Sequence, residues 1–439
     1  MKQILWRAGY WSVAYLLVVI VPLALAIFRG DLDRRGFGTE LGVGLGIVGL
    51  MMLGVQFITT ARFRWVAPFF GSDSLIYFHR QAGILALFVV LAHPLVLFVV
   101  NPEYLLYLDP RENLPRAAFL SLATLALVFL VVLPLWGLRW GLSYEWWRLT
   151  HGLLAAGVLL VGLAHMLQVG HYTSGFAAQA ISVAIVGGFL WFLFQARVVR
   201  PWKMRKRPYR VREVIPDQGD VTRLIIEPLG HEGFAFEAGQ YAWMTIGHSP
   251  FSLQQHPFSF ASSPEKRDEL EFAIKESGDF TGAVQGVLRG TQVFLEGPYG
   301  SFRLDDRAEA AVFLSGGVGV TPALSMLRAA RDRGDQRPFI LMYGNTTEDA
   351  IAYRSELEEL AEQPNVDLVH VLSEADESWS GETGFITDEL LDRHLTKVVG
   401  KDSQYFVCGP PPMMDAVEKA LVKRGVPLNR IMAERFDFI

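Results

Sequence analysis

The chain has 439 residues, about three times the ~150 residues of a typical domain, so we expect two or three domains. Hydrophobic residues make up 51% of the chain and charged residues only 19%, with a mean hydropathy of +0.27. This composition excludes a disordered chain and a nucleic-acid-binding protein. Residues 1–200 carry 14 Lys and Arg against 8 Asp and Glu, whereas residues 201–439 carry 26 against 37, which implies two halves in two different solvents.

Six stretches of the N-terminal half are long and apolar enough to cross the roughly 30 Å hydrocarbon core of a lipid bilayer as helices. The first is too long for a signal peptide and lacks a small-residue cleavage pattern, so we expect it to remain as a span. We therefore predict a six-helix, all-α transmembrane bundle over residues 1–200. Its spans are expected near residues 10–28, 41–60, 76–100, 117–138, 146–168 and 174–196.

The distribution of basic residues predicts the orientation of these spans. An even number of spans places both termini on one side, and the segments on that side hold thirteen Lys and Arg. By the positive-inside rule, both termini face the cytoplasm of a protein in the cell (inner) membrane. The basic run at 197–207 marks the exit from the membrane. Five arginines lie on the opposite side: Arg29, Arg34, Arg35, Arg111 and Arg116.

The C-terminal half has the pattern of a soluble protein. Residues 205–305 contain short alternating segments that predict a small antiparallel β-barrel. Its strands are expected at Tyr209–Val214, Val221–Glu227, Tyr241–Ile246, Glu271–Lys275 and Gln292–Glu296. Residues 306–439 instead alternate strand and helix, which is typical of a parallel α/β sheet. The expected strands are Ala311–Leu314, Phe339–Tyr343 and Gln404–Cys408, and the expected helices begin at Pro322, Arg354 and Met413.

Four histidines lie inside the predicted spans, where a titratable side chain is costly and functional by default. His79 and His93 share the third span, His151 and His165 share the fifth, and both spacings are 14 residues. Fourteen residues turn about 40° short of four full rotations and rise about 21 Å, so each helix presents one imidazole near each membrane face. The two helices run in the same direction, which pairs His79 with His151 on the cytoplasmic side and His93 with His165 on the other.

Two stacked pairs of imidazoles predict two b-type haems, each held by two axial nitrogens. The alternatives are helix-packing histidines or a proton relay. The only cysteine, Cys408, cannot supply the thiolates of an iron–sulfur cluster, so electron carriers must be held otherwise. Small residues near the histidines are expected to leave room for a flat ring. They are Gly83, Ala92, Gly152 and Gly162.

Two motifs of the C-terminal half indicate flavin binding. His256-Pro257-Phe258-Ser259 sits on a barrel strand and offers a hydroxyl for the redox-active ring, and the turn at 278–282 offers backbone N–H groups for the pyrophosphate. Each of these two segments, taken alone, is also common in β-barrel domains. A third segment, Gly316–Pro322, follows a strand and opens a helix, which favours a dinucleotide site. Cys408-Gly409-Pro410 ends a later strand, although Cys408 is also compatible with a plain core residue.

With these motifs in this order, the chain resembles the ferric reductase and NADPH oxidase superfamily. In particular, it resembles bacterial members that join a ferric-reductase-type transmembrane domain to a ferredoxin–NADP reductase-like module. The resemblance implies a catalytic site in which Ser259 lies beside the isoalloxazine ring of FAD and Phe436 stacks on it, with Phe438 as the alternative. It also implies further FAD contacts from His256, Pro257, Phe258, Lys275, Gly278, Asp279, Phe280 and Thr281. The nicotinamide nucleotide is expected between Gly316, Gly317, Val318, Gly319, Thr321 and Pro322 and Cys408, Gly409 and Pro410.

Two positions depart from what is common in this superfamily. Many NADPH-using relatives carry an arginine after the strand ending at Tyr343, where this chain has Asn345-Thr346-Thr347 and only the more distant Arg354. NADPH and NADH therefore both remain open as electron donors. Oxygen-reducing relatives often carry a second histidine one turn after the outer ligand, and that position is Leu97 here. This leaves oxygen and ferric iron open as acceptors.

The predicted function is therefore a transmembrane relay. Cytosolic NAD(P)H reduces FAD, and electrons pass through the inner haem and the outer haem to molecular oxygen, giving superoxide, or to a ferric chelate. The alternative is a membrane-anchored reductase that feeds a quinone or a protein partner. We infer no obligatory protein partner and no nucleic acid.

Overall fold

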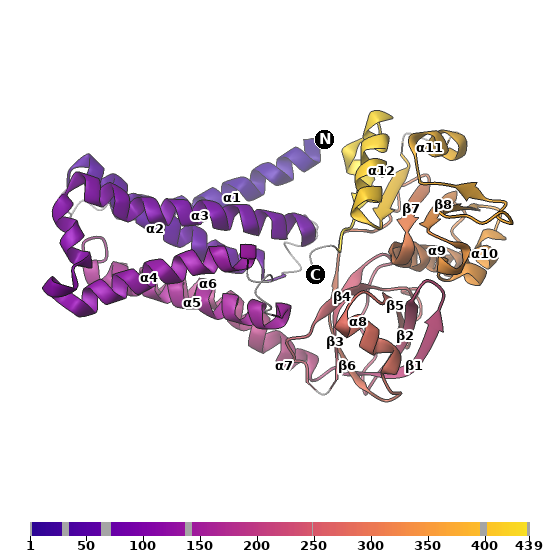
Figure 1. Ribbon diagram of the computed structural model, residues 1–439, viewed down its shortest axis with the longest axis horizontal. Helices are drawn as coiled ribbons and strands as arrows, with labels where there is room; N and C mark the ends of the chain where they lie inside the picture. Colours follow the sequence, from indigo (N-terminus) through magenta and orange to yellow (C-terminus); the bar gives the residue numbers. More distant parts are fainter. Residues whose placement is uncertain are drawn as a thin grey trace. The chain divides into compact units, whose positions relative to one another are not determined.

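The computed structural model describes residues 2–28, 35–62, 72–136, 143–247, 249–395 and 402–436. The chain divides into two compact units (Figure 1). The helical unit comprises Lys2–Phe63 and Ser74–Val199, and the reductase unit is built on Arg200–Ile439.

Within the described residues, the helical unit contains six helices that are long and apolar enough to cross a membrane. The number agrees with the sequence prediction. The fourth helix starts earlier than expected, at Pro110, and bends at the non-helical Asn113. A short 3-10 helix, η1 (Pro102–Leu108), precedes it. The six are α1 (Lys2–Ile27), α2 (Phe37–Thr59), α3 (Ser72–Val100), α4 (Pro110–Trp136), α5 (Tyr144–Val169) and α6 (Phe176–Phe194).

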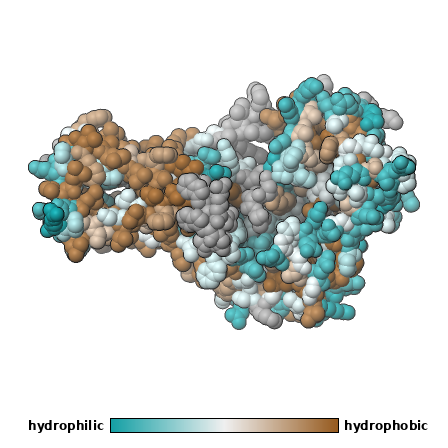
Figure 2. Space-filling view, viewed as in Figure 1, coloured by the Kyte–Doolittle hydropathy of each residue, from teal (hydrophilic) through white to brown (hydrophobic). Residues whose placement is uncertain are grey.

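The outer surface of the helical unit is apolar. Figure 2 shows hydrophobic residues covering most of the visible face of these helices, whereas hydrophilic residues cover much of the reductase unit. Phe88, Leu122 and Leu153 expose 64%, 65% and 62% of their surface. Contiguous apolar surface of this kind is unfavourable in water and is what a lipid environment requires. The chain is therefore a multi-pass membrane protein.

Helix α2 is the central helix of this unit, with 61% of its apolar window buried against 17% or less in the other five spans. Its glycines allow α3 to approach closely. A Cβ added at Gly49 would lie 2.4 Å from Val90, and one added at Gly46 would lie 2.9 Å from Nδ1 of His93. Small residues at such positions are the usual means by which membrane helices pack tightly. The glycines of α2 thus determine how closely α3, and with it His93, approaches α2.

The reductase unit begins with a six-stranded antiparallel sheet in the order β4-β3-β6-β1-β2-β5. An isolated bridge between Phe260 and Phe272 joins the chain after β4 to β5 and helps to close the barrel. A short helix, α8 (Asp279–Ala283), follows β5. The strands are β1 (Tyr209–Asp217), β2 (Val221–Pro228), β3 (Tyr241–Ile246), β4 (His256–Ser259), β5 (Leu270–Lys275) and β6 (Gln292–Tyr299).

A second sheet follows, in which all the paired strands are parallel, in the order β10-β9-β8-β7-β11-β12. Helices α9 (Thr321–Arg333), α10 (Arg354–Ala361), α11 (Asp388–Leu395) and α12 (Pro411–Lys423) connect and cover it (Figure 1). The strands are β7 (Ala311–Gly316), β8 (Phe339–Asn345), β9 (Val366–Leu372), β10 (Glu382–Thr383), β11 (Gln404–Cys408) and β12 (Ile431–Ala433). The fold class predicted from the sequence is confirmed in all three parts.

A buried polar network joins the two sheets of the reductase unit. Arg328 of α9 donates to both carboxylate oxygens of Glu356 at 2.6 Å and to Glu271 of β5 at 2.8 Å. Glu271 also accepts from Arg223 at 2.7 Å and from the hydroxyl of Tyr353 at 2.9 Å. Burial alone would raise the pKa of Glu271, but the two guanidinium groups outweigh it, so the pKa lies below its usual value. The network fixes the nucleotide sheet against the barrel.

Candidate functional site

One histidine pair, His93 and His165, lies between α3 and α5. The ring centres of His93 and His165 are 6.2 Å apart with an angle of 72° between the ring planes. Nδ1 of His93 lies 2.8 Å from the carbonyl oxygen of Gly42. A carbonyl oxygen only accepts, so Nδ1 carries the proton and donates, which leaves Nε2 with a free lone pair. A metal-binding histidine is commonly held by a bond of this kind.

The second pair has nearly the same geometry. The rings of His79 and His151 are also 6.2 Å apart, with an interplanar angle of 75°. Trp147, one helical turn before His151, stacks on that imidazole at 5.6 Å. On the α2 side, the hydroxyl oxygen of Thr59 lies 3.5 Å from Nδ1 of His79. The structure therefore brings together the two pairs that the 14-residue spacing predicts.

The small residues near these pairs do not all serve the same purpose. A Cβ added at Gly83 or Gly152 would meet nothing within 4 Å, so space is open beside both of these positions. At Gly162, by contrast, an added Cβ would lie 2.5 Å from Leu50. The expectation that Gly162 leaves room for a ring is therefore wrong, because this glycine lets α5 pack against α2.

The two halves of the predicted flavin motif meet through Phe280. Its ring stacks on His256 at 4.2 Å and lies at 6.3 Å from Phe258, at interplanar angles of 30° and 15°. Phe280 belongs to α8, which directly follows Gly278, while Lys275 ends β5. The turn is tightened by Thr281, whose hydroxyl donates to the carbonyl of Gly278 at 3.0 Å. Residues 256–259 and 278–281 therefore form one continuous surface.

An aromatic cluster lies beside this surface. Tyr241 pairs with Ser259 across the β3–β4 ladder and packs with Trp243 and Tyr299. Phe436 contacts the same cluster, with its ring 5.7 Å from that of Tyr241 and perpendicular to it. Ser259 and Phe436, 177 positions apart in the sequence, are thus brought to one place. The alternative aromatic, Phe438, lies outside the described residues.

Sequence reasoning missed Tyr241 and Trp243, although both lie on a strand that it predicted. Tyr299 lies three residues beyond the predicted end of its strand, because β6 continues to Tyr299. The local signal was Gly239, whose φ is +89° and whose added Cβ would lie 2.2 Å from the carbonyl oxygen of Phe302. Only glycine tolerates this conformation and this close approach. A glycine that the backbone requires two residues before the start of β3 would have marked Tyr241 as a position held in place.

The glycine loop and the second nucleotide segment are in backbone contact. Gly316 ends β7, and a Cβ added at Gly319 would lie 2.4 Å from the carbonyl oxygen of Cys408. A Cβ added at Gly409 would lie 2.9 Å from the amide nitrogen of Gly316. Strands β7 and β11 are neighbours while β8 lies on the other side of β7, so the strand order reverses here. Open α/β sheets bind ligands at the carboxyl ends of strands at such a point.

Cys408 itself is a buried structural residue. Burial raises the pKa of its thiol well above the usual value. The thiolate is therefore not accessible near neutral pH, and it is the backbone of Cys408 that approaches the glycine loop. Val318, Thr321 and Pro322 complete that loop and the first turn of α9.

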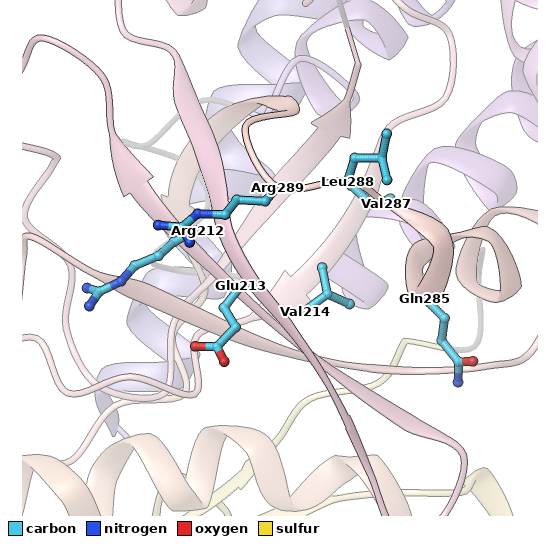
Figure 3. Close-up of a pocket in the computed structure, with 7 residues that line it drawn as sticks. All are labelled: Arg212, Glu213, Val214, Gln285, Val287, Leu288 and Arg289. Atoms are coloured by element: carbon cyan, nitrogen blue, oxygen red, sulfur yellow. The ribbon is translucent and has the colours of Figure 1, made fainter.

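A separate surface pocket of about 590 Å³ lies elsewhere on the barrel. Its lining comes from β1 and from the segment after α8, as Figure 3 shows. None of the predicted flavin or nucleotide residues lines it. The lining residues are Arg212, Glu213, Val214, Gln285, Val287, Leu288 and Arg289.

Known proteins are similar to about half of the chain. NADH-cytochrome b5 reductase 1 of Scheffersomyces stipitis is 36% identical over 272 residues, which cover 58% of this chain and 94% of that protein. The reductase component of propane 2-monooxygenase from Mycolicibacterium goodii is 33% identical over 236 residues, and the match covers 52% of this chain and 66% of that protein. The cytochrome b5 reductase domain of Ulva prolifera nitrate reductase is a similar solved structure, at 22% identity and a TM-score of 0.47, covering 52% of this chain and 97% of that one.

Three family models match the chain in succession. They are the ferric reductase like transmembrane component at residues 45–162, the FAD-binding domain at 210–303 and the oxidoreductase NAD-binding domain at 313–419. Together with the fold, they define the class of membrane proteins that carry a ferredoxin–NADP reductase-like module with FAD and NAD(P)H sites. Within that class, the chain belongs to the ferric reductase and NADPH oxidase superfamily.

Proposed function

We propose that the protein oxidises cytosolic NAD(P)H and exports the electrons through FAD and two b-type haems to an acceptor on the far side of the cell membrane, either oxygen or a ferric chelate. The division at residues 1–200, 205–305 and 306–439 assigns the haems to the first segment, FAD to the second and the nicotinamide to the third. The observation that carries this proposal is the pair of matching imidazole sites in the helical unit.

The separation of the rings supports haem as the ligand. With a metal–imidazole bond of about 2.0 Å on each side, a distance of about 6.2 Å between ring centres would leave room for one metal ion between the two imidazoles of a pair. Both histidine pairs have this separation. Two histidines hydrogen-bonded directly to each other would lie closer, because the nitrogens would be about 2.9 Å apart. His79 and His151 would hold the inner haem, and His93 and His165 the outer one.

The reductase unit supplies the residues that would orient the other two cofactors. FAD accepts a hydride from the nicotinamide and releases electrons singly, which is the chemistry that the two haems require. Ser259 would place its hydroxyl beside the flavin ring, and Phe436 would cover the ring until the nicotinamide arrives. The backbone of 278–281 and the side chain of Lys275 would hold the flavin phosphates. The glycine loop at 316–322 would hold the nicotinamide pyrophosphate at the start of α9.

The environment of Arg354 favours NADH over NADPH. Its side chain donates to Glu358 at 2.9 Å and also contacts Glu348, and these carboxylates raise the pKa of Arg354. A 2′-phosphate would therefore have to compete for this arginine with two carboxylates. An acidic residue after the second strand of such a sheet suits a free ribose hydroxyl instead. The similar cytochrome b5 reductase is likewise an NADH enzyme by name.

We expect kcat/KM to be at least about tenfold higher for NADH than for NADPH. Glu348→Ser should narrow that ratio by removing one of the two competing carboxylates. Steady-state NADH and NADPH oxidation with a soluble acceptor measures both values. A preference for NADPH in the wild-type protein would contradict the proposed donor.

On the far side, a small polar group could receive an anionic acceptor. The guanidinium of Arg35 lies 5.5 Å from the ring of Tyr172, which contacts the ring of His171 at 4.8 Å. Arg116 is placed over the ring of Tyr107 at 4.2 Å, so its charge is already engaged. Arg34 lies outside the described residues. Arg35 is engaged as well, because it forms an ion pair with Glu40 at 3.4 Å. An anionic ferric chelate beside Arg35 and His171 would therefore have to share the charge of the arginine with that carboxylate.

One set of measurements on the purified protein tests the proposal. A reduced-minus-oxidised spectrum should show b-type bands, and a pyridine haemochrome assay should give two haems per chain. Oxygen uptake and ferric chelate reduction, measured side by side with NADH, identify the acceptor. Absence of haem would overturn the relay, and turnover with a quinone but with neither oxygen nor ferric chelate would favour the alternative of a quinone reductase.

A further inference from the structure

Glu296 is a buried carboxylate among the flavin-binding strands, and nothing assigned above uses it. It lies on β6 opposite Trp243 of β3 and exposes only 8% of its surface. An unpaired charge in such a position would be costly, so its partners indicate what it does. Three of these partners come from helix α7 (Arg200–Met204), from β6 itself and from the residue before β4.

The first partner is Arg200, the first residue of the short helix α7. Its guanidinium donates to Oε1 of Glu296 at 2.9 Å, and 17% of the Arg200 side chain is exposed. Met204, one turn later, is also buried. Helix α7 therefore lies beside β6 of the barrel and is held there by this ion pair (Figure 1).

The other two partners belong to the candidate flavin site. The hydroxyl of Tyr299 donates to Oε1 of Glu296 at 2.7 Å, and the amide of Gln255 donates to Oε2 at 3.2 Å. Tyr299 packs in the aromatic cluster that Phe436 contacts, and Gln255 directly precedes the His256–Ser259 strand. The carboxylate of Glu296 thus links α7 to the aromatic cluster through Oε1. It also binds, through Oε2, the residue that precedes β4 of the candidate flavin site.

Helix α7 is the segment by which the chain enters the reductase unit. It follows α6 after a single π-helical turn, η3 (Gln195–Val199), and Pro208 precedes the first barrel strand. A helix held only by its own backbone would be placed loosely on the barrel. An ion pair that is nearly buried and shares its carboxylate with two flavin-site residues fixes α7 to the barrel through packed, directional contacts.

We propose that Arg200 and Glu296 form a positioning clamp for electron transfer out of the flavin. This inference rests on the proposed function, because it requires an acceptor in the helical unit. The clamp holds the exit helix to the flavin-binding strands, and it is not needed for hydride transfer from the nicotinamide, whose residues lie on the other sheet. Neither residue is expected to contact a reacting atom.

The test compares Glu296→Gln and Arg200→Met with Arg200→Lys as the conservative variant. Glutamine keeps the size of the side chain and an acceptor oxygen but removes the charge that pairs with Arg200. The matched control is Glu227→Gln, which breaks the exposed Arg210–Glu227 pair on the same barrel. All four variants are made in the full chain and purified with FAD and haem bound.

Anaerobic stopped-flow spectroscopy then separates two steps. We expect Glu296→Gln to reduce its flavin with NADH at the wild-type rate and to reduce ferricyanide normally, while haem reduction slows by about tenfold or more, since small misplacements have effects of this size. Arg200→Lys should recover part of the loss that Arg200→Met shows. Haem reduction at the wild-type rate in Glu296→Gln overturns the clamp, and so does equal slowing of flavin and haem reduction.

A second readout does not depend on turnover. Hydrogen exchange of the backbone amides of residues 201–207, three of which bond within this segment, should be faster in Glu296→Gln and unchanged in Glu227→Gln. Unchanged exchange in Glu296→Gln overturns the clamp. If the wild-type protein never reduces a haem, the proposed function fails instead, and the exchange experiment alone then decides whether α7 is clamped.

Discussion

The helical unit and the reductase unit use polar residues in opposite ways. In the helical unit, large apolar side chains face outward and glycines such as Gly49 and Gly46 make the close contacts inside. In the reductase unit, the interior contains a complete ionic network around Arg328 and Glu271. Water solvates these charges in the unfolded chain, so several directed hydrogen bonds must compensate for the solvation that they lose on burial. Lipid cannot solvate polar groups, so the few that remain in the spans mark a function.

The difference between the units is tested most strongly by His165→Ala. If the span histidines serve as haem ligands, the haem content should fall from two per chain to about one, and reduction of an external acceptor should fall by more than about 100-fold. The pyridine haemochrome assay and acceptor assays measure these values. The matched control is His171→Ala, which lies outside the two pairs and should keep both haems. Two haems in His165→Ala would mean that this histidine is structural.

The network of the reductase unit should show the next largest effect. Arg328→Met leaves the buried Glu271 and the half-buried Glu356 with fewer partners, so the free energy of unfolding should fall by about 3–5 kcal/mol and the Tm of this unit by roughly 10 °C. FAD release on heating, followed by flavin fluorescence, measures the change. Glu227→Gln, in the exposed pair with Arg210, should cost less than about 1 kcal/mol. Equal effects of the two variants would contradict a special role for the network.

The pKa of Glu271 adds a pH dependence to this prediction. Because the pKa is lower in the folded protein than in the unfolded chain, the ionised carboxylate contributes stability above its ordinary pKa of about 4.3. That contribution is lost as the pH falls through the lower, folded value. The Tm of the wild-type protein should therefore fall more steeply between pH 5 and pH 3 (roughly) than that of Glu271→Gln. Parallel curves would show that Glu271 does not titrate in this way.

The smallest effect is expected from Gly46→Ala in the helical unit. The new methyl group would lie 2.9 Å from Nδ1 of His93, so the imidazole must shift. We expect partial loss of the outer haem and a displaced electron paramagnetic resonance signal, with the inner haem unchanged, at a cost of about 1–3 kcal/mol. Gly187→Ala is the matched control, since a Cβ there meets nothing within 4 Å. A wild-type spectrum for Gly46→Ala would show that α2 moves to accommodate the methyl group and that His93 keeps its position.

Much of the fold could be predicted because its signals are local. Spans are visible as apolar length, and β3 and β11 were predicted with the bounds that they have, because alternation and flanking turn residues are local properties. Strand β9 (Val366–Leu372) and helix α11 (Asp388–Leu395) were missed although both are long enough to carry a pattern. Two shorter strands were missed because they depend on a partner. Strand β10 has two residues and β12 three, and each exists only because a neighbouring strand offers hydrogen bonds. Their own residues carry too little pattern to predict them.

The candidate site likewise contains features with a local sequence signal and features without one. Helical periodicity alone pairs His79 with His151 and His93 with His165, because a rigid helix converts spacing into depth. Glycine motifs likewise indicate the nucleotide-binding loop. Nothing local connects Arg200 with Glu296, which are 96 positions apart, or Arg328 with Glu271, 57 positions apart. The sequence by itself determined the number of spans, the depths of the histidines and the order of the cofactor motifs. Only the tertiary structure decided which buried charges meet, because that depends on which strands and helices pack against each other.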